Sequence, residues 1–137
     1  MSWDVLIIRL NNPPPEGSNL PDVFDPLPLG SGEDLKSDIS KLFPGIDWSH
    51  PSLGSLQNPD FTIEFSFPRE CDVNNLMLHI FGSGNPLPII CRLCTEFGWY
   101  AYDTTLSTFM DVNNPSEQGW EEYMNYRNQI FRHLNEK

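Results

Sequence analysis

The sequence has no apolar run that approaches the roughly 20 residues of a membrane-spanning helix. Its start, Met1 to Asp4, also lacks the basic segment and the apolar segment of a secretory signal peptide. The cysteines are few and odd in number: Cys71, Cys91 and Cys94. A chain of this size needs no disulfide bonds to fold, so this number fits a reducing compartment. We therefore expect a cytoplasmic protein without a membrane partner.

Basic residues are scarce. Eight Lys and Arg stand against 19 Asp and Glu, which gives a formal net charge of -11. Residues 1 to 60 hold nine of the acids and three of the bases. This charge repels phosphate groups, so we expect no binding to nucleic acid or to an anionic membrane surface. A basic protein surface would be attracted instead, although the charge could also serve solubility alone.

Catalytic and metal-binding motifs are missing. Cys91 and Cys94 have the spacing of a redox pair but fall inside a predicted helix, where small core residues are the simpler interpretation. The chain has three histidines, which lie far apart in sequence and lack zinc-site spacing: His50, His79 and His133. Asp47 to His50 contains residue types of a catalytic triad, but adjacent loop residues cannot form its geometry. We predict no enzyme, no metal and no cofactor.

A glycine-rich segment, Gly82 to Asn85, lies between a predicted strand and a predicted helix. Such a turn can hold a phosphate at the amino terminus of the helix. The segment lacks the third glycine of a dinucleotide motif and the Gly-Lys-Ser/Thr ending of a nucleotide loop. We favour glycines that permit a tight turn, and keep a small-molecule site as the alternative.

The 137 residues are the usual size of one domain, in which roughly two thirds of the unfolded surface can be buried. Hydrophobic residues make up 39% of the chain, enough for one core despite 13 prolines. Six of these prolines fall between residues 11 and 29, which predicts a long surface loop rather than a helix or strand.

Hydrophobic spacing predicts the remaining elements. Strands are expected at 3–10, 53–56, 61–67, 75–81, 99–103 and 106–111, with apolar residues on both faces of the first and fourth. Helices are expected from Ser31 to Phe43, from Asn85 to Phe97, and from a capping box at Asn114 to Leu134. The fold class is therefore α+β: one mixed or antiparallel sheet of about five to six strands, with about three helices on one face in a two-layer sandwich.

Carboxylates and two aromatic residues gather in the loop, the first helix and the segment after it. The candidate partner-binding residues are Asp22, Asp25, Glu33, Asp34, Asp38, Asp47, Trp48 and His50. Acidic rims around aromatic anchors are typical of interfaces that bind a basic partner. A core tryptophan beside a solvated acidic face would give the same pattern.

Four segments together resemble a group of small bacterial proteins, some of which are similar to immunity proteins of contact-dependent and polymorphic toxin systems. They are Leu29 to Ser31, Leu42 to Trp48, Gly98 to Asp103 and Phe109 to Asp111. The resemblance implies an acidic cytoplasmic protein that neutralises one cognate toxin domain by covering or distorting its active site. It carries over no functional residue.

Our leading hypothesis from the sequence is an immunity protein that binds a basic toxin domain, possibly a nuclease, through its acidic loop and first helix. One alternative is an adaptor or regulatory subunit without a toxin partner, which shares the same composition. The other is a small-molecule protein or enzyme that uses the turn at 82–85.

Overall fold

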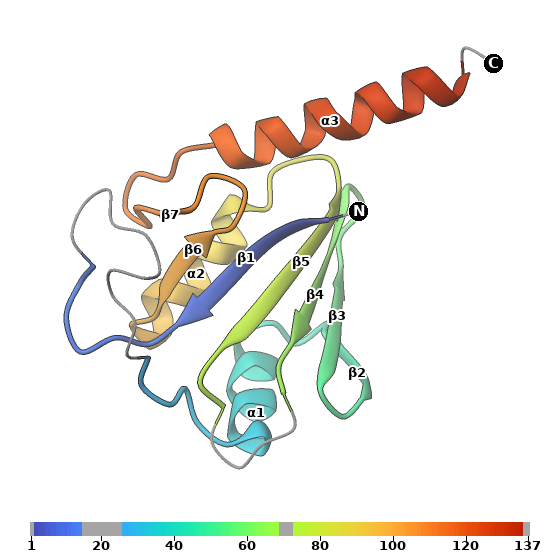
Figure 1. The fold of residues 1–137 in the computed structure, drawn as a ribbon. Helices are drawn as coiled ribbons and strands as arrows, with labels where there is room; N and C mark the ends of the chain where they lie inside the picture. The colour runs from blue at the N-terminus through green and yellow to red at the C-terminus, as the bar shows by residue number, and fades with distance from the viewer. Residues whose placement is uncertain (1, 15–25, 69–72, 136–137) are drawn as a thin grey trace.

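The computed structural model describes residues 2–14, 26–68 and 73–135, and the elements below are those of these residues. They form seven strands and three helices (Figure 1). In chain order these are β1 (Trp3–Ile8), α1 (Gly32–Leu42), β2 (Asp47–His50), β3 (Leu53–Gln57), β4 (Phe61–Ser66), β5 (Leu76–Gly82), α2 (Leu87–Phe97), β6 (Tyr100–Asp103), β7 (Thr108–Phe109) and α3 (Gln118–Asn135).

The strands form one sheet in the order β2-β3-β4-β5-β1-β6-β7, and every neighbouring pair is antiparallel. The predicted α+β class is confirmed, with one strand more than expected. The additional strand is β2, whose sequence Asp47 to His50 was interpreted as a loop. Its residues do not alternate clearly between apolar and polar, and the strand exists because it pairs with β3 at the edge of the sheet.

One face of the sheet carries the core. Alternate residues of the interior strand β1 are buried on this face, together with the matching residues of β4 and β5. Those of β1 are Trp3, Val5 and Ile7. On the opposite face Asp4 and Leu6 are half-buried, and Ile8 at the end of β1 is buried. The prediction that the first strand is covered on both faces therefore holds only at Ile8, because the helices that bury most of the apolar surface lie on one side.

Helices α1 and α2 lie side by side against the core face (Figure 1). As predicted, α1 is capped by Ser31, whose Oγ accepts a hydrogen bond from the Asp34 amide at 3.2 Å. The helix buries Leu35 and Ile39. Helix α2 buries Leu87, Ile90, Leu93 and Cys94, and ends at Gly98 in the left-handed conformation with φ 69°.

Helix α3 crosses the end of the sheet where β1 begins, and its second half extends away from the sheet (Figure 1). It begins at Gln118, four residues after the predicted cap at Asn114. Asp111 accepts hydrogen bonds from the Asn113 and Asn114 amides, which holds that segment in a turn, and Ser116 Oγ then accepts from the Gln118 amide. No helix within the described residues is both long enough and apolar enough to cross a membrane.

The described ends of the proline-rich loop are joined to the body by backbone hydrogen bonds. The Leu27 amide donates to the Arg9 carbonyl at 2.8 Å, and the Leu29 amide donates to the Val73 carbonyl at 2.7 Å. Two candidate partner-binding residues, Asp22 and Asp25, lie outside the described residues.

Candidate functional site

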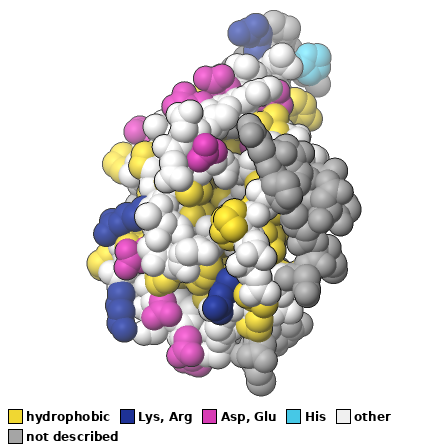
Figure 2. All heavy atoms as spheres, turned by 90° about the vertical axis from the view of Figure 1, so that its left-hand side faces the viewer, with side chains coloured by type: hydrophobic (Ala, Val, Ile, Leu, Met, Phe, Trp, Pro, Cys, Tyr) yellow, Lys and Arg dark blue, Asp and Glu magenta, His cyan; other side chains and the backbone are white. Residues whose placement is uncertain are grey.

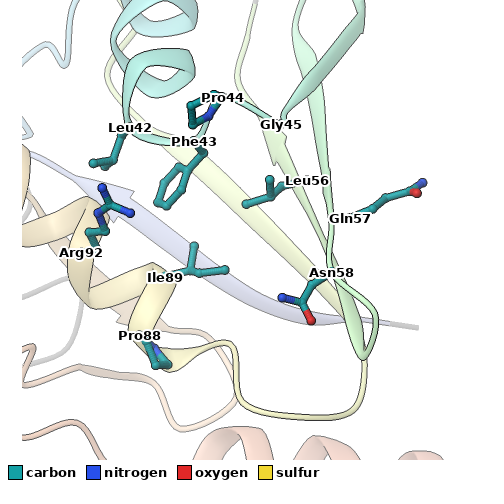
Figure 3. A pocket seen from close by; sticks show the side chains of 10 residues that line it. All are labelled: Leu42, Phe43, Pro44, Gly45, Leu56, Gln57, Asn58, Pro88, Ile89 and Arg92. Carbon is teal, nitrogen blue, oxygen red and sulfur yellow. The ribbon is translucent and has the colours of Figure 1, made fainter.

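An apolar hollow of about 420 Å³ lies where the end of α1, the start of α2 and strand β3 meet (Figure 3). Its lining comes from three separate parts of the chain: Leu42, Phe43, Pro44, Gly45, Leu56, Gln57, Asn58, Pro88, Ile89 and Arg92. The volume falls within the range of about 300–1,000 Å³ that is usual for binding sites in proteins. The hollow is therefore large enough to accept the side chain of a partner.

The local sequence explains why no side chain of the protein fills the apolar hollow. Pro44 and Gly45 end α1 and redirect the chain toward β2, so the first helix does not reach over the end of β3. Leu42, Leu56 and Ile89 are left half-buried at the edge of the core rather than inside it. These three side chains provide the apolar surface of the hollow (Figure 3).

Charged side chains continue the hollow along the seam between α1 and α2. A second depression of about 420 Å³ is lined by Asp38, Lys41, Leu42, Arg92, Glu96 and Phe97. Leu42 and Arg92 border both depressions, so the apolar one and the charged one lie next to each other. We call the two together the α1–α2 groove. The Arg92 guanidinium lies 5.7 Å from the centre of the Phe43 ring, an attractive cation–π contact.

The structure places the predicted acidic residues at different positions relative to this groove. Asp38 lines its charged part. Glu33 and Asp34 are exposed in the first turn of α1, where a negative charge is favoured by the helix dipole. Asp47 and His50 are exposed on the edge strand β2. The described candidate residues thus follow α1 and β2 without meeting at one point.

Trp48 connects β2 to α1. Its Nε1 donates a hydrogen bond to Ser40 Oγ at 2.8 Å, and its ring centre lies 5.9 Å from that of Phe67. Lys36 Nζ lies 5.7 Å from the centre of the Trp48 ring. The half-buried side chain packs against the core. This arrangement supports the structural interpretation of Trp48, which holds the edge strand, more than the role of an exposed anchor.

The amides of the glycine-rich turn donate hydrogen bonds to groups of the protein itself. The Ser83 amide donates to the Asp60 carbonyl at 2.9 Å, and the Leu87 amide of α2 donates to Asn85 Oδ1 at 3.2 Å. A Cβ added at Gly84 would lie 2.7 Å from Asp60 Cβ, so a carboxylate stands beside the turn. A phosphate would meet that negative charge and would find these amides already paired. The glycines serve the turn itself, with φ 109° at Gly82 and 79° at Gly84.

The two described cysteines are unsuited to redox chemistry. Cys94 is buried, and desolvation raises the pKa of its thiol to about 12. The pKa of the Cys91 thiol is raised as well, chiefly by desolvation and further by the Asp111 carboxylate. Both thiols are therefore protonated near neutral pH, and only the thiolate is a nucleophile or a metal ligand.

The described ranges also contain no cluster of three or more His, Cys, Asp or Glu side chains suited to a metal ion. One pair of titratable groups does meet on the open face of the sheet, where His79 Nδ1 lies 2.8 Å from Asp4 Oδ1. Sequence reasoning did not find this pair, because the two residues are 75 positions apart and meet through the pairing of β1 with β5.

Apart from Asp38, the groove residues were also missed. Leu42 and Ile89 belong to the apolar stripes of their helices, and a stripe does not show which of its members a neighbouring element leaves open. A usable signal was the pair of prolines, Pro44 and Pro88, which end or begin a helix at the same place. Comparison with known proteins gave no match to a family model, to a curated protein or to a solved structure.

Proposed function

We propose that this protein is a protein-binding module that receives an apolar side chain of its partner in the α1–α2 groove. The observation that carries the proposal is the position of the two depressions: an apolar hollow and a charged depression lie next to each other and share Leu42 and Arg92 in their linings. A hydrophobic anchor beside a polar rim is the usual arrangement of a binding hot spot.

The free energy of burial favours an apolar side chain of the partner as the occupant. Full burial of one Leu, Ile or Phe side chain contributes about 1.5–3 kcal/mol. The half-buried Leu42, Leu56 and Ile89 provide the apolar surface against which it would be buried. Asp38 and Glu96 lie at the charged end of the same groove. A partner with Lys or Arg next to its apolar anchor would match both parts.

The charge of the whole chain points to a basic partner. With a formal net charge of -11, the protein attracts positively charged surfaces and accelerates their association at low ionic strength. Together with the resemblance to immunity proteins, this supports a cytoplasmic immunity protein that binds a basic toxin domain, possibly a nuclease, and blocks its activity. Exposed Glu33, Asp34 and Asp47 would lie around the contact.

Growth protection is the direct test of this function. Cells that produce the toxin domain encoded next to this protein should survive when the wild-type protein is present. The variant Ile89→Glu places a charge in the apolar hollow and should lose protection, and Asp38→Lys should weaken it. The matched control is Glu64→Lys, which makes the same charge change on the opposite face of the sheet.

Binding of the purified toxin domain should follow the same order, with an affinity loss of about tenfold or more for Ile89→Glu. Equal losses for Asp38→Lys and Glu64→Lys would contradict the groove as the contact. A wild-type protein that binds a cellular partner tightly but never protects growth would be an adaptor, and the immunity proposal would then fail while the binding proposal stands.

A further inference from the structure

The second half of α3 is an amphipathic helix end without a partner in the described part of the chain. The large hydrophobic side chains that are well exposed among the described residues all lie there: Tyr126 at 58%, Phe131 at 46% and Leu134 at 56%. The helix begins in the core, where the Trp120 ring centre lies 5.5 Å from that of Trp3, and then extends away from the sheet (Figure 1). This surface is separate from the α1–α2 groove.

Two of these exposed side chains, Tyr126 and Leu134, lie on one side of the helix with the half-buried Ile130 between them. The three residues follow one another at intervals of four and form a stripe about 12 Å long. Side chains on the neighbouring side of the helix contact one another. The Arg127 guanidinium lies 4.7 Å from the Phe131 ring centre, and Arg127 Nη1 donates a hydrogen bond to Asn128 Oδ1. The Tyr126, Ile130 and Leu134 stripe therefore remains available for another molecule.

Charge indicates what this molecule is. Residues 126–137 carry Arg127, Arg132 and Lys137 against Glu136, a formal net charge of +2. The other 125 residues carry 18 acids and 5 bases, a net charge of -13. Figure 2 shows Lys or Arg and His side chains at the raised tip, while Asp and Glu side chains lie over the body below it. A basic apolar tip is thus complementary to the acidic body of the same protein.

We propose that two copies of this chain associate through an antiparallel pairing of their α3 helices. The acids of α3 lie in its first part, with Glu121 and Glu122, and its bases in its last part, with Arg132 and His133. An antiparallel pair places unlike charges together at both ends, whereas a parallel pair would place like charges together. With a two-fold axis near Asn128, Tyr126 packs beside Ile130 of the second copy, and Glu122 lies near its His133.

This occupant fits better than an anionic membrane or a nucleic acid. Either of those would bind the basic tip but would be repelled by the body with its net charge of -13. A second copy places the acidic first part of its α3, with Glu121 and Glu122, beside the basic tip. It also places its own apolar stripe against that of the first copy. The short contact predicts a weak, concentration-dependent dimer.

The test is sedimentation of the full chain from about 10 μM to about 1 mM, a range that covers weak dimers. We expect a monomer–dimer equilibrium for the wild type and a dissociation constant about tenfold higher or more for Ile130→Asp. The control is Asn125→Asp, which adds the same charge to an exposed position off the stripe and should dimerise like the wild type. Circular dichroism of both variants checks that α3 is retained.

Charge exchange tests the antiparallel register. Glu122→Arg and His133→Glu should each weaken the dimer. The double variant should restore it, because residue 122 of each copy meets residue 133 of the other and the two exchanged charges attract again. A wild type that stays monomeric throughout the range overturns the proposal, as does a dimer that Ile130→Asp leaves unchanged. A monomer that binds vesicles with anionic lipid through the same stripe would overturn it in favour of a membrane surface.

Discussion

At the scale of single residues, Asp103 stands out because it is the one charged side chain that is buried among the described residues. It is 2% exposed and is the last residue of β6. Its Oδ1 accepts hydrogen bonds from Trp3 Nε1 at 3.1 Å and from the amides of Thr105 at 2.9 Å and Leu106 at 3.3 Å. This one carboxylate fixes the turn between β6 and β7 and also orients a core tryptophan.

Asp103 also explains the glycine in the first turn of α3. A Cβ added at Gly119 would clash with Asp103 Oδ2. No larger residue therefore fits at position 119 while β6 and α3 keep their positions. The close approach puts the carboxylate beside the amino-terminal end of a helix, where a negative charge is favoured. Desolvation nevertheless dominates and raises the pKa of Asp103, with a further contribution from Glu122, against the hydrogen bonds that lower it.

The raised pKa has a consequence for stability. Between the unfolded and the folded pKa of Asp103 the native state binds more protons than the unfolded chain, so this residue's contribution is present at low pH and lost as pH rises. The variant Asp103→Asn removes the titration. We expect the free energy of unfolding of the wild type, relative to the variant, to fall as pH rises from about 3 and to level off above the folded pKa.

Denaturant unfolding of both proteins between about pH 3 and 7 measures this difference. The comparison of slopes is insensitive to any constant effect of the amide on packing. A difference that is flat, or that grows with pH, would contradict the raised pKa.

At the scale of elements, α1 carries the candidate groove and depends on its cap. Ser31 Oγ satisfies the Asp34 amide, one of the amides that a helix leaves unpaired at its start. We expect Ser31→Ala to lower the free energy of unfolding by about 1 kcal/mol. The matched control is Ser37→Ala, an exposed position inside the same helix, where alanine is expected to be neutral or slightly stabilising.

Thermal and urea unfolding of the two variants measures the effect. If Ser31→Ala and Ser37→Ala had equal stability, the cap would contribute nothing. If Ser31→Ala also weakened partner binding, the start of α1 would be coupled to the groove at its other end.

At the scale of the whole molecule, the uneven charge opposes the compact state. A body with a net charge of -13 repels itself, and salt screens this repulsion over about 10 Å at 0.1 M. We expect the Tm to rise by a few degrees when NaCl is raised from about 10 to 200 mM. The Ile130→Asp variant, in which the proposed dimer is expected to be weaker, separates this effect from any change in association. A Tm that fell with salt would contradict self-repulsion.

Much of the fold could be predicted from the sequence, because its signals are local. The alternation of Phe61, Ile63 and Phe65 indicates a strand with one buried face, and the helical spacing of Leu35 and Ile39 after Ser31 indicates a capped helix. The predicted α+β class with three helices follows from these patterns. The start of α3 could not be predicted, because Asn114 has the residue type of a cap, whereas in the structure its amide is held in the turn formed by Asp111 and the helix begins only at Gln118.

The candidate site was much less predictable than the fold. The acidic residues of α1 and β2 are visible in the sequence as charges, but the position of Trp48 between β2 and α1 depends on contacts with Ser40 and Phe67. The α1–α2 groove depends on where two helices stop short of covering β3. Neither feature corresponds to a motif.

By itself, the sequence determined the acidic charge, the fold class and most of its elements, because composition, hydrophobic periodicity and capping act within a few residues of one another. The tertiary structure alone decided that Leu42, Leu56 and Ile89 share one hollow, that Asp4 meets His79, and that the end of α3 extends beyond the sheet. These features join residues that are far apart along the chain. They depend on strand order and on the angles at which helices pack, which local patterns do not specify.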